Sequence, residues 1–168
     1  DNGSTDNTKT IVKNQITLCT YPLKLLTEEK KGVGFARRKG MNDASARGFD
    51  ILAGTDADSY VQTDWIESII KTFEETKADC LFGLATFDWS ILKTLPDVYA
   101  IIHDTWVVRQ SIGKRITTPA RGVNFAITRE MYERVGGMPQ PQSETGQSLP
   151  GEDIELRKLV EAEGGKIG

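Results

Sequence analysis

Phe49-Asp50-Ile51-Leu52-Ala53-Gly54, followed at once by Thr55-Asp56-Ala57-Asp58-Ser59, is the stretch that decides the fold. The first half is short and largely apolar, which predicts a buried strand. The second half places two carboxylates two residues apart beyond that strand, where open α/β sheets bind ligands. Mg²⁺ commonly takes one or two carboxylates together with substrate phosphates, so the stretch predicts a site for Mg²⁺ or Mn²⁺ and a diphosphate. The alternative is that both acids cap a turn into the following helix.

Composition limits the kinds of partner. The chain has 168 residues, a net charge of −3 and a pI of about 5.3. This length suits one domain, and we expect residues 1–168 to form a single, truncated one. The mild acidity argues against nucleic acid, which would require a basic stripe. It leaves room for an anionic small molecule that binds together with a metal ion.

The number and placement of the cysteines and the histidine exclude some kinds of metal site. Cys19 and Cys80 lie far apart in strand-like runs, and we expect both to be buried and reduced, as in a cytosolic domain. His103 is the sole histidine of the sequence, so no His-based zinc cluster can form. It lies among apolar and aromatic residues, which is typical of a packed helix histidine.

The ends of the chain suggest a fragment. The sequence opens on Asp1-Asn2-Gly3-Ser4 with no strand before it, and residues 164–168 stand where another strand should begin. No signal peptide and no run of about 18 apolar residues is visible. We expect a piece of a longer protein that is cytoplasmic, with the full-length protein placed at the cytoplasmic face of the membrane as the alternative.

The alternation of strands and helices predicts an α/β domain with a mostly parallel sheet between layers of helices. The expected strands cover residues 16–20, 49–54, 79–85 and 122–127. The first expected helix has its cap at residues 4–6 and ends at about residue 14, and another helix follows a cap at residue 63 or 64. The other expected helices cover residues 34–47, 91–112, 129–135 and 152–163. In the segment after residue 64, Ile66, Ile69, Ile70 and Phe73 have the spacing of one buried helix face. Residues 140–150 are polar, and we expect a mobile loop there.

Two polar motifs flank this core. Asp1-Asn2-Gly3-Ser4-Thr5-Asp6 is a turn whose side chains suit a nucleotide base or ribose, although a helix-capping loop would look the same. Gly151-Glu152-Asp153 opens the last helix, where the helix N-terminus favours an ionised carboxylate. Ordinary first-turn acids are the alternative there.

Taken together, the motifs resemble those of the inverting glycosyltransferases of family 2, which have the GT-A fold. The resemblance rests on residues 1–6, Gly32 to Gly40, Asp56-Ala57-Asp58, Gly136-Gly137 and Gly151-Glu152-Asp153, in the family's order over nearly the whole chain. It implies a Rossmann-like α/β/α domain that transfers a sugar from a nucleoside diphosphate sugar, with a UDP-sugar favoured. The acceptor would be a hydroxyl of a glycan, a lipid-linked molecule or another compound, and the configuration at the sugar would invert.

The resemblance also implies roles on the donor side. Asp1, Asn2 and Ser4 would contact the donor nucleoside, and Arg37 would lie near the nucleotide. The family often has aspartate where this chain has Asn2, which leaves the base less certain because asparagine adds a donor. Arg38 stands where the family usually has asparagine, and it would either add positive charge towards the phosphates or face solvent.

The resemblance also assigns the binding of the metal and the catalytic chemistry to acidic residues. Asp58 would be the main metal ligand, with Asp56 binding the ribose or the water shell of the metal. Asp153 matches the family's general base, because inversion by a single displacement requires a carboxylate that takes the proton of the attacking hydroxyl. Glu152 would orient the acceptor.

The sequence leaves the roles of the residues on the sugar side open. Gly122 and Asn124 open a strand that should end near the sugar, although a core-strand role is equally open. Trp89, Tyr99 and Trp106 could stack on an acceptor sugar, but core packing is favoured.

Two rival functions remain. A nucleotidyltransferase would require a glycine-rich, basic phosphate loop near the start, and none is visible. A non-catalytic sugar-nucleotide-binding module would not require intact Asp56, Asp58 and Asp153.

Overall fold

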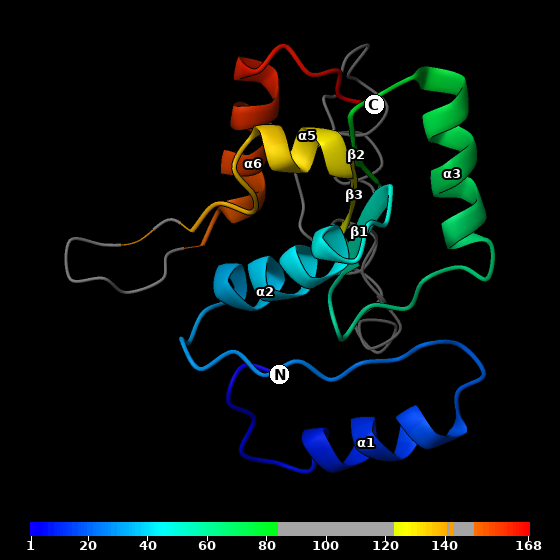
Figure 1. The fold of residues 1–168 in the computed structure, drawn as a ribbon, viewed down its shortest axis with the longest axis vertical. Coiled ribbons are helices and arrows are strands. Elements are labelled where there is room, and N and C mark those ends of the chain that lie inside the picture. Colours follow the sequence, from blue (N-terminus) through cyan, green and yellow to red (C-terminus); the bar gives the residue numbers. More distant parts are fainter. Residues whose placement is uncertain (84–122, 141, 143–149) are drawn as a thin grey trace, which may run out of the picture.

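The structure is a computed structural model that describes residues 1–83, 123–140, 142 and 150–168. Five helices are described in these ranges: α1 (Thr8–Leu18), α2 (Val33–Ala46), α3 (Trp65–Thr76), α5 (Arg129–Arg134) and α6 (Glu152–Ala162) (Figure 1). They accompany three strands: β1 (Ile51–Thr55), β2 (Cys80–Phe82) and β3 (Asn124–Thr128). The strand before Asp56-Ala57-Asp58, which we call the D-x-D motif, and the last helix therefore form where the sequence predicted them.

The three strands form one sheet in the order β1-β3-β2, and both pairs are antiparallel. The sequence predicted a mostly parallel sheet. β1 and β2 do run in the same direction, but β3 enters between them in the opposite one. Cys80 also forms a parallel bridge with Ile167, where the sequence predicted a further strand to begin. The alternation of strands and helices identifies the strands but not the direction in which each enters the sheet.

Helices cover both faces of the sheet (Figure 1). Alternate residues of a strand point to opposite faces. The larger core cluster joins residues of all three strands to α2, α5 and α6, and includes Leu52, Phe125, Ile127, Met131 and Leu156. The smaller cluster packs α3 on the other face through Ile69, Phe73, Ala78, Leu81 and Ala126. The expected three-layer α/β/α arrangement is confirmed.

Helix α3 buries only part of its predicted face. Ile69 and Phe73 are buried, whereas Ile66 and Ile70 remain 54% and 43% exposed. Trp65 packs against the smaller cluster instead. The i, i+4 pair faces the sheet, and the two exposed isoleucines lie further round the helix.

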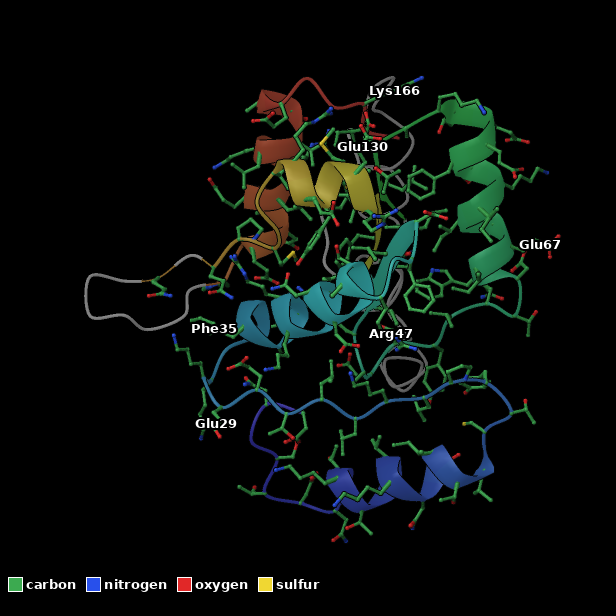
Figure 2. All side chains as sticks on the ribbon, in the orientation of Figure 1. Glu29, Phe35, Arg47, Glu67, Glu130 and Lys166 are labelled. Carbon is green, nitrogen blue, oxygen red and sulfur yellow. The ribbon has the colours of Figure 1, made fainter. Side chains whose placement is uncertain are left out.

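The N-terminal segment differs from its prediction. The sequence predicts a strand over residues 16–20, but α1 continues to Leu18. The helix begins after Asn7, and the Oδ1 atom of Asp6 accepts a hydrogen bond from the Thr8 N–H at 3.0 Å. No residue of α1 is buried, and Figure 2 shows it set apart from the side chains that fill the core. Strand propensity did not decide this segment, because it has no neighbouring strand to pair with among the described residues.

The two cysteines are both free but differ in burial. Cys80 is fully buried in β2, as predicted, and burial raises the pKa of its thiol to about 12. Cys19 is only half-buried.

Several predictions fall outside the described residues. These are the segment 91–112 with His103, the aromatic residues Trp89, Tyr99 and Trp106, and most of the loop 140–150. Within the described ranges, no helix has the length and apolar character that a bilayer crossing requires.

Candidate active site

Strand β1 presents the D-x-D motif at its carboxyl end. Thr55, its last residue, pairs with Asn124 of β3, and the Thr55 hydroxyl donates to the Val123 carbonyl at 2.9 Å. The chain then turns through Asp56, whose side chain is 39% exposed, to the exposed Asp58. Within the described part of the chain, the Asp58 carboxylate makes no hydrogen bond or ion pair. It is therefore available to a cation.

The start of α6 presents the second acidic pair. Gly151 precedes the helix with φ 103°, a left-handed conformation that glycine adopts without a steric cost. Glu152 and Asp153 follow in the first turn, where the helix dipole favours negative charge. The Glu152 side chain is only 4% exposed. The Oδ1 atom of Asp153 accepts the backbone N–H of Ile154 at 2.8 Å.

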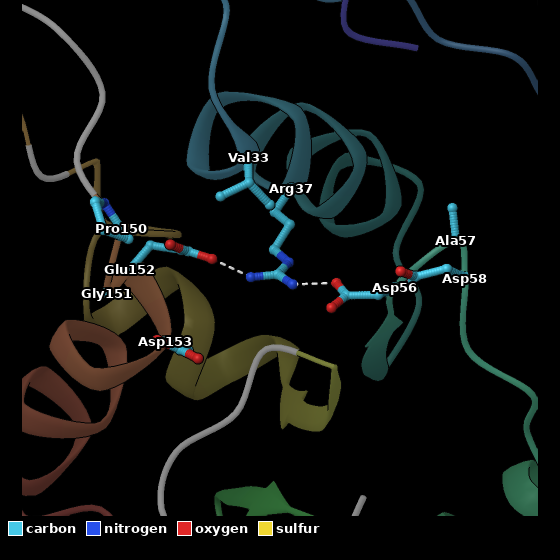
Figure 3. A pocket seen from close by; sticks show the side chains of 9 residues that line it. All are labelled: Val33, Arg37, Asp56, Ala57, Asp58, Pro150, Gly151, Glu152 and Asp153. Carbon is cyan, nitrogen blue, oxygen red and sulfur yellow. Dashed lines mark hydrogen bonds and ion pairs between the residues drawn. The ribbon is translucent and has the colours of Figure 1, made fainter. Parts of the chain in front are cut away.

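Arg37, in the second turn of α2, joins the two acidic pairs. Its Nη1 atom donates to Oε1 of Glu152, and its Nη2 atom donates to Oδ1 of Asp56 (Figure 3). The Arg37 side chain is 15% exposed. The guanidinium therefore connects the end of β1 with the start of α6, and Arg37 and Glu152 are 115 residues apart along the chain.

These residues line one cleft of about 620 Å³ between α2, the end of β1 and the start of α6 (Figure 3). Its lining holds Val33, Arg37, Asp56, Ala57, Asp58, Pro150, Gly151, Glu152 and Asp153. The lining thus brings four carboxylates together with one guanidinium, a clear excess of negative charge. A divalent cation would compensate this charge.

The available ligands fit Mg²⁺ or Mn²⁺ bound in the company of a phosphate. Among the described residues, no group of three or more His, Cys, Asp or Glu side chains is arranged to hold a metal by itself. Mg²⁺ keeps several waters and needs only one or two protein carboxylates when substrate phosphates share its coordination. Asp58, with Asp56 beside it, meets that requirement.

Asn2 lies outside the lining of this cleft and holds the segment before α2. Its Nδ2 atom donates to the carbonyls of Glu28 at 2.9 Å and Lys30 at 2.7 Å. Its Oδ1 atom accepts the N–H of Gly32, the N-cap of α2, at 2.7 Å. Both amide hydrogens are thus engaged. The predicted nucleoside contact of Asn2 stays a prediction, and a base could still bind its remaining lone pair.

Asp1 and Ser4 also lie apart from the cleft lining. The Asp1 carboxylate is 1% exposed and pairs with Lys9 at 3.1 Å. It accepts the N–H groups of Gly3 and Ser4, both at 3.2 Å, and so closes the turn. Ser4 is exposed. Their roles towards a donor nucleoside stay predictions.

Comparison with known proteins identifies the family. Residues 1–136 match the sequence model of glycosyl transferase family 2. The chain belongs to this family. Over 139 residues it is 30% identical to the glycosyltransferase AglE of Haloferax volcanii, an alignment that covers 83% of this chain and 44% of AglE.

A solved structure shows the same fold. The mannosyltransferase PcManGT of Pyrobaculum calidifontis, in complex with GDP-Man and Mn²⁺, superposes with a TM-score of 0.65 at 20% sequence identity. The match covers 99% of this chain and 43% of PcManGT. This family 2 chain therefore has the GT-A fold that its motifs implied. It spans less than half the length of either relative.

Of the two residues predicted for the sugar side of this family 2 domain, the structure describes Asn124 and places it outside the cleft lining. Asn124 begins β3, and its Oδ1 atom accepts from Nε1 of Trp65 at 3.0 Å. It lines a separate pocket between α3 and the sheet. Gly122 lies outside the described residues. Their roles near the donor sugar stay predictions.

Arg38 has a role that the sequence did not show. Its Nη1 and Nη2 atoms donate to the carbonyls of Met138 at 3.0 Å and Gly136 at 3.3 Å. The guanidinium thus holds the glycine turn after α5 against α2, rather than facing phosphates or only solvent. The contact between Arg37 and Glu152 was missed as well, because no local spacing connects an arginine to a glutamate in a distant motif.

Proposed function

We propose that this chain is the donor-binding and catalytic domain of a glycosyltransferase. It moves a sugar from a nucleoside diphosphate sugar to a hydroxyl acceptor, with inversion and with the help of a divalent cation. The observation that supports this proposal is the meeting of Asp56, Asp58 and Asp153 in one cleft. Membership of family 2 supports the type of reaction.

The acidic cleft explains the need for a cation. A nucleoside diphosphate is anionic, and it would be repelled by a lining with four carboxylates and one guanidinium. Asp58 would hold Mg²⁺ or Mn²⁺, which when bound neutralises charge on the departing diphosphate. The Mn²⁺ bound with GDP-Man in PcManGT supports this part of the proposal.

Asp153 is the general base of the proposal. It lines the cleft at the N-terminus of α6, whereas the adjacent Glu152 is buried against Arg37. As the acceptor oxygen attacks the anomeric carbon, its proton passes to the Asp153 carboxylate. The bond from that carbon to the diphosphate breaks on the opposite side of the sugar, which inverts the configuration.

For the donor base and the acceptor, we propose only the chemical class. The sequence favours a uridine diphosphate, and guanosine is the alternative because PcManGT binds GDP-Man. The acceptor is a hydroxyl of a glycan, a lipid-linked molecule or another compound. We place the full-length protein in the cytoplasm, at the face of the membrane if the acceptor is lipid-linked.

Calorimetric titration tests the donor site. UDP, GDP and other nucleoside diphosphates are titrated into the full-length protein, each with Mn²⁺ and with EDTA. We expect one nucleotide to bind in Mn²⁺ and to lose its binding in EDTA, because the diphosphate reaches the acidic cleft only with a cation. A folded full-length protein that binds no nucleotide in Mn²⁺ would contradict the proposal.

A further inference from the structure

We propose that Arg37 is a positioning residue that sets the geometry of both acidic pairs of the active site at once. Its guanidinium holds Asp56 beside Asp58 and Glu152 beside Asp153. This inference rests on the proposed function, because it assigns Arg37 to the geometry of that reaction. It does not give Arg37 a direct contact with the reacting atoms.

The burial of Glu152 makes a charge partner necessary. Glu152 is buried, and its side chain is only 4% exposed. A buried carboxylate without a partner carries a large desolvation cost. Within the described part, Arg37 is the only side chain that pairs with it. The pair therefore fixes where Glu152 can lie.

The two contacts use two different nitrogens of one planar group. Nη1 binds Glu152 and Nη2 binds Asp56, so the guanidinium spans the distance between two segments. A lysine ammonium has the same charge but is a compact group at the end of a flexible chain. It cannot hold both carboxylates in the same fixed orientation. The geometry thus requires arginine, and not merely a positive charge.

Helix α2 presents Arg37 from a fixed position. Asn2 binds the N–H of Gly32 at the start of the helix, and Arg38 binds the carbonyls of Met138 and Gly136. A methyl group added to Gly34 would lie 3.6 Å from Cβ of Glu152, so α2 passes close to the start of α6. Positions 34, 37 and 38 lie on one helix face, because residues three and four apart are neighbours.

The consequence for the reaction follows from the positions of the held acids. Glu152 immediately precedes the proposed base, and Asp56 lies two residues before the proposed metal ligand. Fixing the first acid of each pair restricts the backbone that carries the second. A displacement of about 1 Å of a reacting group can lower turnover about 10²-fold. Arg37 therefore determines whether Asp58 and Asp153 face the same substrate.

The test compares Arg37→Lys with the wild type in the full-length protein. Turnover at saturating donor and acceptor, and the urea midpoint of unfolding, are measured for both. We expect a urea midpoint close to that of the wild type, because lysine retains a charge for Glu152. We expect turnover to fall by about 10- to 100-fold, because the two acids are no longer held together. Wild-type turnover in Arg37→Lys would overturn the inference.

A matched control and a double variant separate positioning from folding. Lys39→Ala removes a positive charge from an exposed position of the same helix, and should leave turnover and the urea midpoint unchanged. Arg37→Ala should unfold at lower urea, because Glu152 loses its partner. Adding Glu152→Gln should recover the midpoint but not the turnover. A double variant that recovers both would show a purely structural role and overturn the inference.

The two proposals fail in different ways. If the proposed function is wrong, the wild-type protein shows neither metal-dependent nucleotide binding nor transfer. If only the role of Arg37 is wrong, the wild type transfers sugar and Arg37→Lys does so equally well.

Discussion

The two acidic pairs of the cleft use one arginine in the same way. Asp56 and Asp58 follow β1, and Glu152 and Asp153 open α6. The first member of each pair binds Arg37, and the second also lines the cleft (Figure 3). Two acids close together in sequence thus differ in their contacts, and we propose that one member of each pair supports the site while the other acts on the ligand.

The pairs differ in how firmly their first member is held. The Glu152 side chain is 4% exposed, whereas that of Asp56 is 39% exposed. Solvent screens an exposed ion pair more than a buried one. The α6 pair should therefore depend more on Arg37 for its stability. The D-x-D pair depends more on the strand that precedes it, whose last residue is held by the register with β3.

The largest expected effect separates the two members of the α6 pair. Asp153→Asn should lower turnover by about 10²–10⁴-fold, the usual contribution of a general base. Nucleotide binding in Mn²⁺ should remain nearly unchanged, because Asp153 acts on the acceptor. Steady-state kinetics and calorimetry on the full-length protein measure both. Glu155→Gln is the control variant in the same helix turn. Near-wild-type turnover in Asp153→Asn would exclude Asp153 as the general base.

A smaller effect separates the two members of the D-x-D pair. Asp58→Asn should weaken Mn²⁺-dependent nucleotide binding by about 100-fold, and Asp56→Asn should weaken it by about 10-fold. Loss of a residue that supports a metal ligand usually lowers metal affinity by about 10- to 100-fold. Asp58 is available to the metal, whereas Asp56 is already bound to Arg37. Calorimetry in Mn²⁺ and in EDTA measures the difference. Equal losses of nucleotide affinity in the two variants would contradict the proposal that Asp58 binds the metal and Asp56 only supports the site.

The smallest effect tests the dependence of the D-x-D pair on its strand. A methyl group added to Gly54 of β1 would lie 2.5 Å from Cε1 of the buried Phe125. Gly54→Ala should therefore lower the free energy of unfolding by about 1–3 kcal/mol, as overpacked cores do. It should also weaken Mn²⁺-dependent nucleotide binding, because the turn after β1 shifts.

Gly40→Ala is the matched control for that change. A methyl group at Gly40 of α2 meets no atom within 4 Å. The replacement of glycine by alanine inside a helix should raise the free energy of unfolding by about 0.5–1 kcal/mol. Urea denaturation compares the two variants. If Gly54→Ala were as stable as Gly40→Ala, the sheet would not constrain the D-x-D turn as described.

Local patterns in the sequence predicted much of the fold. The apolar run before Asp56 formed β1, and the acids after Gly151 opened α6. The β-branched residues Ile16 and Thr17 misled the prediction, because α1 continues through them. Strand formation depends on a partner strand, which propensity alone does not supply. The direction of β3 in the sheet was missed for a similar reason, since pairing is a long-range property.

The sequence by itself determined the family and which residues are the candidates for its chemistry. The order of Asp56, Asp58, Glu152 and Asp153 along the chain, with the glycine turns between them, was sufficient to predict a metal site and a base of family 2. Only the tertiary structure decided which acid of each pair is held by Arg37. That choice depends on burial and on distances between segments far apart in the chain. A local motif contains neither, because both arise only when α2, β1 and α6 pack around the same cleft.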